Sequence, residues 1–174
     1  MNAEERRQGI LKELQKARRP KSASALAAVF HVSRQIIVGD VALLRAAGHN
    51  IAATPRGYCL DDTRGALIRR IACRHRADEM RDELYAIVDE GCTALNVTVE
   101  HPLYGELSGK LMCSSRHDVD EFIRRSGEAE AQPLSMLTEG IHLHDLSCPD
   151  EAAFERVKNR LAGLGVLLED GTAR

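Results

Sequence analysis

Along the first part of the chain, apolar residues recur at the three- and four-residue spacing of helices. Residues 4–17 place Ile10, Leu11 and Leu14 on one face and charged side chains on the other, which is the pattern of an amphipathic helix. Pro20 and the polar residues after it end this helix. The chain is therefore predicted to open with a helix that packs one face against a core.

Two further helices are predicted, separated by a tight turn. The first covers residues 24–30, and the second begins at Ser33, a residue type that caps helix N-termini, and ends at Gly48. The core-facing stripe of the second helix consists of Ile37, Val41 and Leu44. Two helices joined in this way form the motif that places a recognition helix in the major groove of DNA.

The segment 51–60 is predicted to form a β-hairpin, with Arg56 at the tip of its turn. A hairpin behind a helix-turn-helix is the wing of a winged helix. Arginine and glutamine side chains make paired contacts to guanine and adenine edges. The candidate DNA contacts are Ser33, Arg34, Gln35, Val38 and Arg56.

Charge is divided unevenly along the chain. Residues 1–60 carry ten Lys or Arg against four acidic residues, a balance of +6, so the remainder carries −8 within the total of −2. A basic half indicates an anionic partner, here double-stranded DNA. The alternative is a small helical domain that binds protein. Gly39 favours that alternative, because it costs the recognition helix about 1 kcal/mol relative to alanine and offers no side chain to a base.

Beyond a polar joint at residues 61–65, short apolar runs alternate with amphipathic helical stretches. Strands are predicted at 67–73, 95–100, 107–113, 141–146 and 165–169, and helices at 77–90, 118–125 and 150–161. Strands and helices in this order indicate an α+β domain with a mixed sheet. The chain is therefore predicted to consist of a winged helix-turn-helix, 1–62, and a regulatory domain, 63–174.

Two histidines offer the clearest chemistry of the second domain. His142 and His144 lie at i and i+2 of a predicted strand, so both imidazoles point to one face. Two imidazoles side by side suit zinc or another divalent transition metal. The alternative is two histidines on a solvated face.

His75 and Glu83 are candidate partners of this pair. On one continuous helix, eight residues would separate them by about 12 Å. They would share an ion only if His75 lay at the end of a strand, before the helix begins. Glu79 and Asp82 are rival carboxylates, and an ordinary helix surface is the alternative for all three acidic residues.

A third polar group follows a predicted strand, in the segment 101–106, which contains His101, Tyr104 and Glu106. Proline and glycine indicate a tight turn here. Ligand sites favour a few convergent polar groups. The segment is either part of such a site or a structural turn with incidental polar residues.

Composition excludes several classes of protein. The five cysteines are scattered and contain no C-x-x-C pair, a pattern typical of reduced thiols rather than of disulfides or a cysteine zinc site. No apolar run reaches the about 18 residues of a membrane helix, and residues 2–7 are too polar for a signal peptide. We expect a soluble, cytoplasmic protein with no membrane partner.

Three stretches of the sequence resemble a known family: VSRQIIVGDVALLRAAGHNIAATPRGYCL, VEHPLYGEL and PLSMLTEGIHLHDLSCPD. They are similar to the niacin-responsive transcriptional repressors, in which a winged helix is joined to a three-histidine domain. The resemblance spans about residues 6–168. Its most specific parts are HPLYGEL and LTEGIHLH.

The resemblance implies repression of niacin-uptake or NAD-biosynthesis genes, with nicotinic acid as corepressor at a site for a divalent transition metal of the zinc class. The implied site residues are His75, Glu83, His142 and His144 for the metal and His101 and Tyr104 for the effector. It also implies that His75 precedes its helix. In a homodimer, which we expect, two recognition helices would match half-sites about 34 Å apart. Gly39 departs from the family, whose members tend to carry a polar side chain there.

Two other functions stay open at this point. One is a metal-dependent enzyme joined to a DNA-binding domain. Because the chain lacks H-E-x-x-H, G-x-S-x-G and a phosphate-binding loop, we expect a regulator and not an enzyme. The other is a metal-responsive repressor, whose DNA affinity would follow the metal concentration and ignore niacin.

Overall fold

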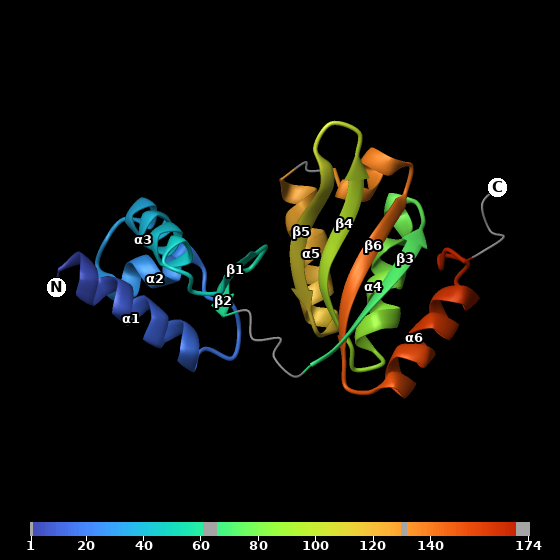
Figure 1. Ribbon diagram of the computed structural model, residues 1–174, viewed down its shortest axis with the longest axis horizontal. Helices are drawn as coiled ribbons and strands as arrows, with labels where there is room; N and C mark the ends of the chain where they lie inside the picture. The colour runs from blue at the N-terminus through green and yellow to red at the C-terminus, as the bar shows by residue number, and fades with distance from the viewer. Residues whose placement is uncertain (1, 61–65, 130–131, 170–174) are drawn as a thin grey trace. The chain divides into compact units, whose positions relative to one another are not determined.

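The computed structural model describes residues 2–60, 66–129 and 132–169. The chain divides into two compact units, Met1–Asp62 and Thr63–Arg174, drawn in Figure 1. The predicted polar joint at 61–65 lies outside the described residues.

The N-terminal unit contains three helices followed by a hairpin. Its elements are α1 (Ala3–Lys16), α2 (Ala23–Phe30), α3 (Arg34–Ala46), β1 (Ile51–Thr54) and β2 (Gly57–Leu60). The side chains of Asn2, Ser22 and Ser33 cap the three helices by accepting main-chain N–H groups of the first turn. The predicted helices and hairpin are confirmed.

The core of this unit is built on the predicted stripe of α3. Ile37, Val41 and Leu44 are buried together with Ile10 and Leu26 of α1 and α2. The axes of α2 and α3 differ by 103°, within the range of helix-turn-helix motifs. This arrangement leaves the opposite face of α3 at the surface.

A buried ion pair ties α1 to α3. Asp40 is 4% exposed, and Arg6 Nε donates to its Oδ2 over 2.6 Å. Arg7 lies within 3.7 Å of the same carboxylate. Arginines on the polar face of α1 therefore fix the position of α3 through Asp40.

The regulatory unit is an α+β domain with one four-stranded sheet. Its elements are β3 (Leu67–Arg74), the 3-10 turn η1 (Ala77–Glu79), α4 (Met80–Val88), β4 (Thr93–His101), β5 (Gly105–Cys113), α5 (Arg116–Glu128), the 3-10 turn η2 (Leu134–Thr138), β6 (Ile141–Cys148) and α6 (Glu151–Gly163). In Figure 1 helices α4 and α5 lie behind the sheet, which faces the viewer. Apolar residues of these helices and α6 share one core with the sheet.

The strand order is β3-β6-β4-β5, and all of its pairings are antiparallel. The α+β class is confirmed, whereas the predicted mixed pairing is corrected to an antiparallel ladder. The reason is that β6 inserts between β3 and β4. Those two strands run in the same direction, as a strand–helix–strand unit predicts, but they do not touch as neighbours.

Residues 165–169 do not form the predicted closing strand. Leu167 makes a single antiparallel bridge to Cys73, and Leu168 N donates to the Ala72 carbonyl. A bend at Gly165, with φ +73°, turns the chain after α6 so that only these few residues line the edge of β3.

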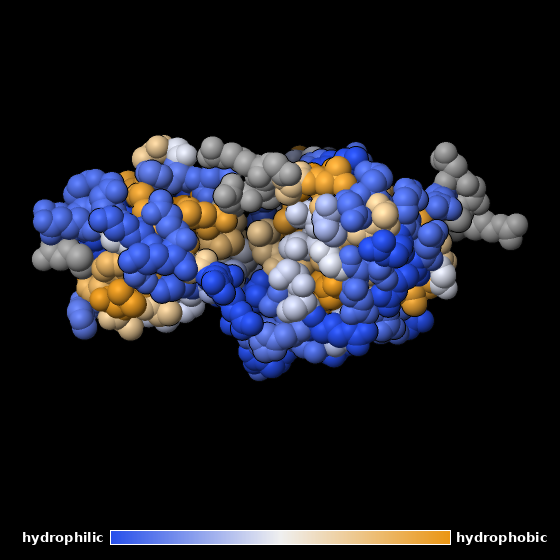
Figure 2. Space-filling view, turned by 90° about the horizontal axis from the view of Figure 1, so that it is seen from below, coloured by the Kyte–Doolittle hydropathy of each residue, from blue (hydrophilic) through white to orange (hydrophobic). Residues whose placement is uncertain are grey.

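The face of the regulatory unit seen in Figure 2 is largely hydrophilic with scattered apolar patches. Within the described ranges, no single helix is long and apolar enough to cross a membrane, and only α2 and α3, as a bent pair, pass that test jointly.

Candidate functional site

The predicted metal-site residues meet on the sheet face that α4 covers. β3 ends at Arg74, so His75 lies between this strand and the helix, as a shared site requires. His142 and His144 project from β6, and Glu83 projects toward them from α4. All four side chains are buried, with Glu83 only 1% exposed.

Glu83 lies at the centre of the three imidazoles. Its Oε2 is 2.7 Å from His75 Nε2, and its Oε1 is 3.0 Å from His142 Nε2. His144 Nε2 lies 3.3 Å from Oε2 but is not aligned for a hydrogen bond. Among the described side chains, His144 Nε2 is therefore a buried nitrogen without a hydrogen-bond partner.

The opposite nitrogen of each imidazole is fixed by the main chain. His75 Nδ1 donates to the Arg76 carbonyl over 2.7 Å, His142 Nδ1 to the Gly140 carbonyl over 2.8 Å, and His144 Nδ1 to the Asn96 carbonyl over 2.5 Å. A carbonyl oxygen only accepts, so each Nδ1 carries a hydrogen. In the neutral rings, each Nε2 then presents a lone pair toward Glu83.

This donor set fits a divalent cation. Lone pairs and a carboxylate that converge in a buried space repel one another unless positive charge lies between them. Protonating all three rings would leave excess positive charge in the core, whereas one divalent ion would satisfy the carboxylate and the imidazoles together. Backbone carbonyls that orient ligating histidines are common around protein-bound metals.

The pKa values of Glu83, His75 and His144 also indicate that this cluster favours positive charge. Burial opposes the charged form of Glu83, but a ring protonated at Nε2 attracts the carboxylate and donates to it, and this outweighs burial and holds the pKa of Glu83 well below its ordinary value. Burial also opposes protonation of His75 and His144, yet Glu83 raises the pKa of both. Positive charge and the carboxylate therefore stabilise each other here.

Gly140 shapes the site through its backbone. It has φ +89°, and a Cβ at this position would lie 2.3 Å from the His75 carbonyl oxygen. Only glycine fits this close approach. The Gly140 carbonyl also accepts the His75 N–H over 3.4 Å, so one residue joins the start of β6 to the end of β3 and orients His142.

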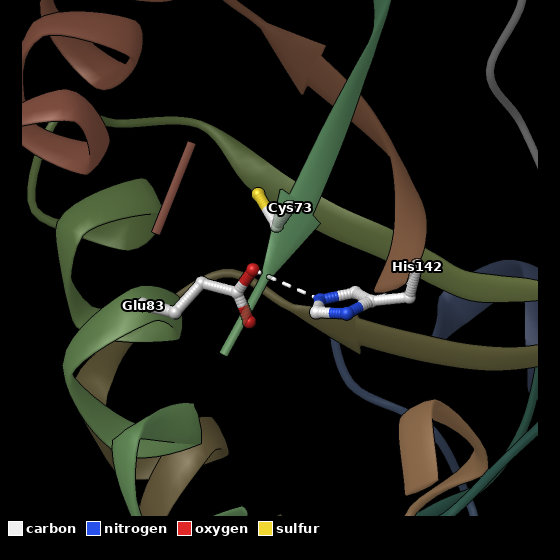
Figure 3. A group of neighbouring side chains, drawn as sticks. All are labelled: Cys73, Glu83 and His142. Atoms are coloured by element: carbon white, nitrogen blue, oxygen red, sulfur yellow. Dashed lines mark hydrogen bonds and ion pairs between the residues drawn. The ribbon is translucent and has the colours of Figure 1, made fainter. Parts of the chain in front are cut away.

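Sequence reasoning missed one member of the cluster, Cys73. Its Sγ, a Glu83 oxygen and a His142 ring nitrogen lie within 4.8 Å of one another. Figure 3 shows Glu83 of α4 and His142 of β6 pointing toward each other, with Cys73 of β3 beside them. The signal was present in the sequence, since Cys73 is the last residue of a predicted strand and His75 follows two positions later.

The rival carboxylates lie outside the cluster. Asp82 is exposed on α4, and Glu79 accepts the main-chain N–H of Arg76. Glu79 instead stabilises the 3-10 turn before the helix.

The predicted effector residues lie in the β4–β5 hairpin. His101 Nδ1 accepts the N–H groups of Leu103 and Tyr104, and its ring stacks on Tyr104 at 5.1 Å. Tyr104 is 70% exposed. Within the described part of the domain, neither side chain joins the hydrogen bonds or ion pairs of the histidine cluster.

A cavity of about 560 Å³ adjoins the cluster. It is lined by His75, Arg76, Ala77, Asp78, Met136, Glu139 and Gly140. The cavity therefore reaches the histidine cluster through His75 and Gly140, and its other lining residues belong to η1 and the η2–β6 connection.

The predicted DNA contacts gather at the start of α3 and at the hairpin. Arg34 and Gln35 are exposed, Val38 is half-buried, and Ser33 caps the helix. Arg56 lies in the turn between β1 and β2. Gly39 is on the same exposed face, and no atom lies within 4 Å of where its Cβ would be.

Comparisons with known proteins agree with both units. An HTH domain family matches residues 6–59, and the 3H domain family matches residues 68–170. The chain is 40% identical over 168 residues to the probable transcription repressor NiaR of Thermotoga maritima, covering 97% of this chain and 96% of that protein. The chain belongs to the NiaR/NadR family of transcription repressors.

A second relative supports the same assignment. The transcription repressor NadR of Bacillus subtilis is 38% identical over 169 residues, which cover 95% of this chain and 94% of that protein. As a NiaR/NadR-type repressor, the chain combines a DNA-binding helix-turn-helix with a 3H domain. Both relatives are named as transcription repressors, which assigns the chain to a family of regulators.

Proposed function

We propose that this NiaR/NadR-type repressor uses nicotinic acid as its corepressor, bound at a divalent-metal site of the 3H domain. The metal would be held by His75, Glu83, His142 and His144. In this proposal the protein acts in the cytoplasm as a homodimer and represses niacin-uptake or NAD-biosynthesis genes.

One observation carries the proposal. Three buried imidazoles have their Nδ1 atoms held by main-chain carbonyls, and their Nε2 atoms converge on Glu83. Such a cluster serves no need of the apolar core, because burying these groups costs free energy that only positive charge offsets. A divalent ion of the zinc class suits the nitrogen and oxygen donors.

The cavity beside His75 supports an effector site next to the metal. Nicotinic acid is a planar ring with a carboxylate, and a bound cation would supply a positive centre for that carboxylate or for the ring nitrogen. The 560 Å³ cavity lies within the volume range of small-molecule pockets. His101 and Tyr104 remain proposed effector contacts, offered by the hairpin as a stacked pair.

Binding of nicotinic acid would change the affinity for DNA by changing the arrangement of the two subunits of the dimer. A ligand shifts an equilibrium between two arrangements only when it binds one of them better. Here the favoured arrangement would set the distance between two recognition helices, which must match half-sites on one face of the duplex.

The test is DNA binding with and without nicotinic acid. DNA selected from a random pool by the metal-loaded protein would be labelled and titrated by fluorescence anisotropy. We expect nicotinic acid to tighten binding and nicotinamide, which lacks the carboxylate, to have little effect. The His142→Ala/His144→Ala double variant should lose the response, and His117→Ala, which alters an exposed histidine of α5, should keep it.

A metal-responsive repressor is the second candidate, because the same cluster would serve as a metal sensor. In that case the anisotropy titration would follow the metal concentration and would ignore nicotinic acid. This outcome would overturn the corepressor proposal while leaving the metal site in place.

A further inference from the structure

The buried thiol of Cys73 faces the histidine cluster. Cys73 lies opposite His142 in the β3–β6 register, and paired residues on neighbouring strands project from the same face of a sheet. The residue is fully buried. Its Sγ lies within 4.8 Å of a Glu83 oxygen and a His142 ring nitrogen, the two side chains drawn beside it in Figure 3.

We propose that Cys73 supplies a thiolate ligand to the metal, in addition to the histidines and Glu83. This inference rests on the metal site of the proposed function and extends it by one donor. It assigns the site a sulfur atom, which the other proposed ligands do not provide.

A second, independent observation points to an ion at this place. His144 Nε2 is buried without a hydrogen-bond partner in the described structure, and its residue is 2% exposed. Its other ring nitrogen is already used by the Asn96 carbonyl. Cys73 and this ring nitrogen, which has no hydrogen-bond partner among the described residues, both lie beside Glu83.

The spacing of the donors is close to that of a shared ion. Zinc–sulfur bonds measure about 2.3 Å and zinc–nitrogen bonds about 2.0–2.1 Å, so two such ligands lie at most about 4.4 Å apart. The 4.8 Å span of the Cys73, Glu83 and His142 atoms requires only a small adjustment. On binding, the Sγ–H bond breaks, a sulfur–metal bond forms and the proton leaves to solvent.

A second buried cysteine of the same sheet has different surroundings. Cys113 on β5 is 1% exposed, and its Sγ lies 3.8 Å from the Leu111 carbonyl oxygen. It therefore serves as the matched control, a buried core thiol placed away from the histidines.

The proposed ligand sets the metal preference of the site. Thiolates favour zinc and similar ions, whereas oxygen donors suit magnesium and manganese. Replacing the sulfur should lower zinc affinity by about tenfold or more and change manganese affinity much less. The ratio of the two affinities thus reports on Cys73 itself and not on general damage to the site.

The test is the absorption spectrum of the full-length protein loaded with Co²⁺. Visible d–d bands report cobalt binding, and near-ultraviolet sulfur-to-cobalt charge transfer reports a thiolate ligand. We expect both in the wild type and in Cys113→Ala, and only the visible bands in Cys73→Ser and Cys73→Ala. The serine variant keeps a side chain of similar size, so loss of folding in the alanine variant would not obscure the result.

The outcomes separate the two proposals. Visible bands without charge transfer in the wild type would overturn the thiolate ligand and leave the histidine–glutamate site standing. Charge transfer that survives in Cys73→Ser would equally overturn it. Failure of the folded wild type to bind Co²⁺ or Zn²⁺ would overturn both the ligand and the metal site of the proposed function.

Discussion

The ring of His144 is held in place by the main-chain carbonyl of Asn96, which accepts its Nδ1–H over 2.5 Å. Asn96 lies where the β4–β6 register shifts, between Ala94 and Thr98. Such an irregularity frees a main-chain group from the ladder. The freed carbonyl directs His144 Nε2 toward Glu83, so an irregularity in one strand orients a side chain on the next.

The side chain of Asn96 stabilises this irregularity. Its Nδ2 donates to Asp145 over 2.7 Å, and its Oδ1 accepts the Asp145 N–H over 2.9 Å. We expect Asn96→Ala to lower metal affinity by about tenfold, the size typical of groups that orient ligands. Competition with a chelator measures it, and Asn159→Ala on the exposed face of α6 is the control. Equal affinities in both variants would contradict the positioning role.

Two helical glycines of the DNA-binding unit should respond oppositely to alanine. A Cβ at Gly39 meets nothing within 4 Å, whereas one at Gly9 would lie 2.7 Å from the Phe30 ring. Gly39→Ala should stabilise the protein by about 1 kcal/mol, and Gly9→Ala should destabilise it. Urea unfolding measures the free energy of unfolding of both variants.

The Gly39→Ala variant also tests how closely α3 approaches DNA. If this variant is more stable yet binds DNA more weakly, the backbone of α3 approaches DNA at that position. Unchanged DNA binding would contradict such an approach.

The Arg6–Asp40 pair should matter for the stability of the winged helix. Removing one partner of a buried ion pair leaves the other charge without compensation. We expect Asp40→Ala to lower the melting temperature of this unit by about 5–10 °C, measured by circular dichroism. The control is Glu4→Ala, which removes the exposed partner of Arg7 and should have a much smaller effect. Similar effects of the two variants would show that burial of the pair is unimportant.

The lowered pKa of Asp89 predicts that the stability of the regulatory unit depends on pH. Hydrogen bonds from Arg116, and then from Arg160, lower its pKa from 3.8 to about 2. Because the folded-state pKa lies below the unfolded value, the stability from the charged carboxylate is present above pH 3.8 and is lost as the pH falls toward 2. Asp89→Asn should therefore destabilise the protein at neutral pH and approach the wild type in acid.

Urea unfolding at neutral and acidic pH checks this expectation. Asp82→Asn, at an exposed carboxylate of α4, the helix that Asp89 follows as C-cap, provides the control and should follow the wild type at each pH. A destabilisation by Asp89→Asn that stays constant down to pH 2 would contradict the assignment.

Local pattern was sufficient for much of the fold. The stripe of Ile37, Val41 and Leu44 predicted the buried face of α3, and Ser33 predicted its N-cap, because capping and periodicity depend on neighbours in sequence. The alternation around His142 and His144 likewise predicted that both rings share a face. These features need no knowledge of distant contacts.

The remaining features depend on pairing between distant segments. The sequence does not show that β6 inserts between β3 and β4, so neither the antiparallel ladder nor the placement of Cys73 opposite His142 was predicted. The carbonyl of Asn96 was missed for the same reason. The sequence alone predicts a surface position for the charged side chain of Asp40, and only the fold brings it to Arg6.

The central claim is that metal and corepressor share one site in the 3H domain. Calorimetric titration of nicotinic acid into metal-loaded protein tests it most directly, with the His142→Ala/His144→Ala variant and the exposed-site control His117→Ala alongside. We predict binding by the wild type and the control and none by the double variant. Nicotinic acid binding of equal strength in the folded double variant, or none in the metal-loaded wild type, would contradict the claim.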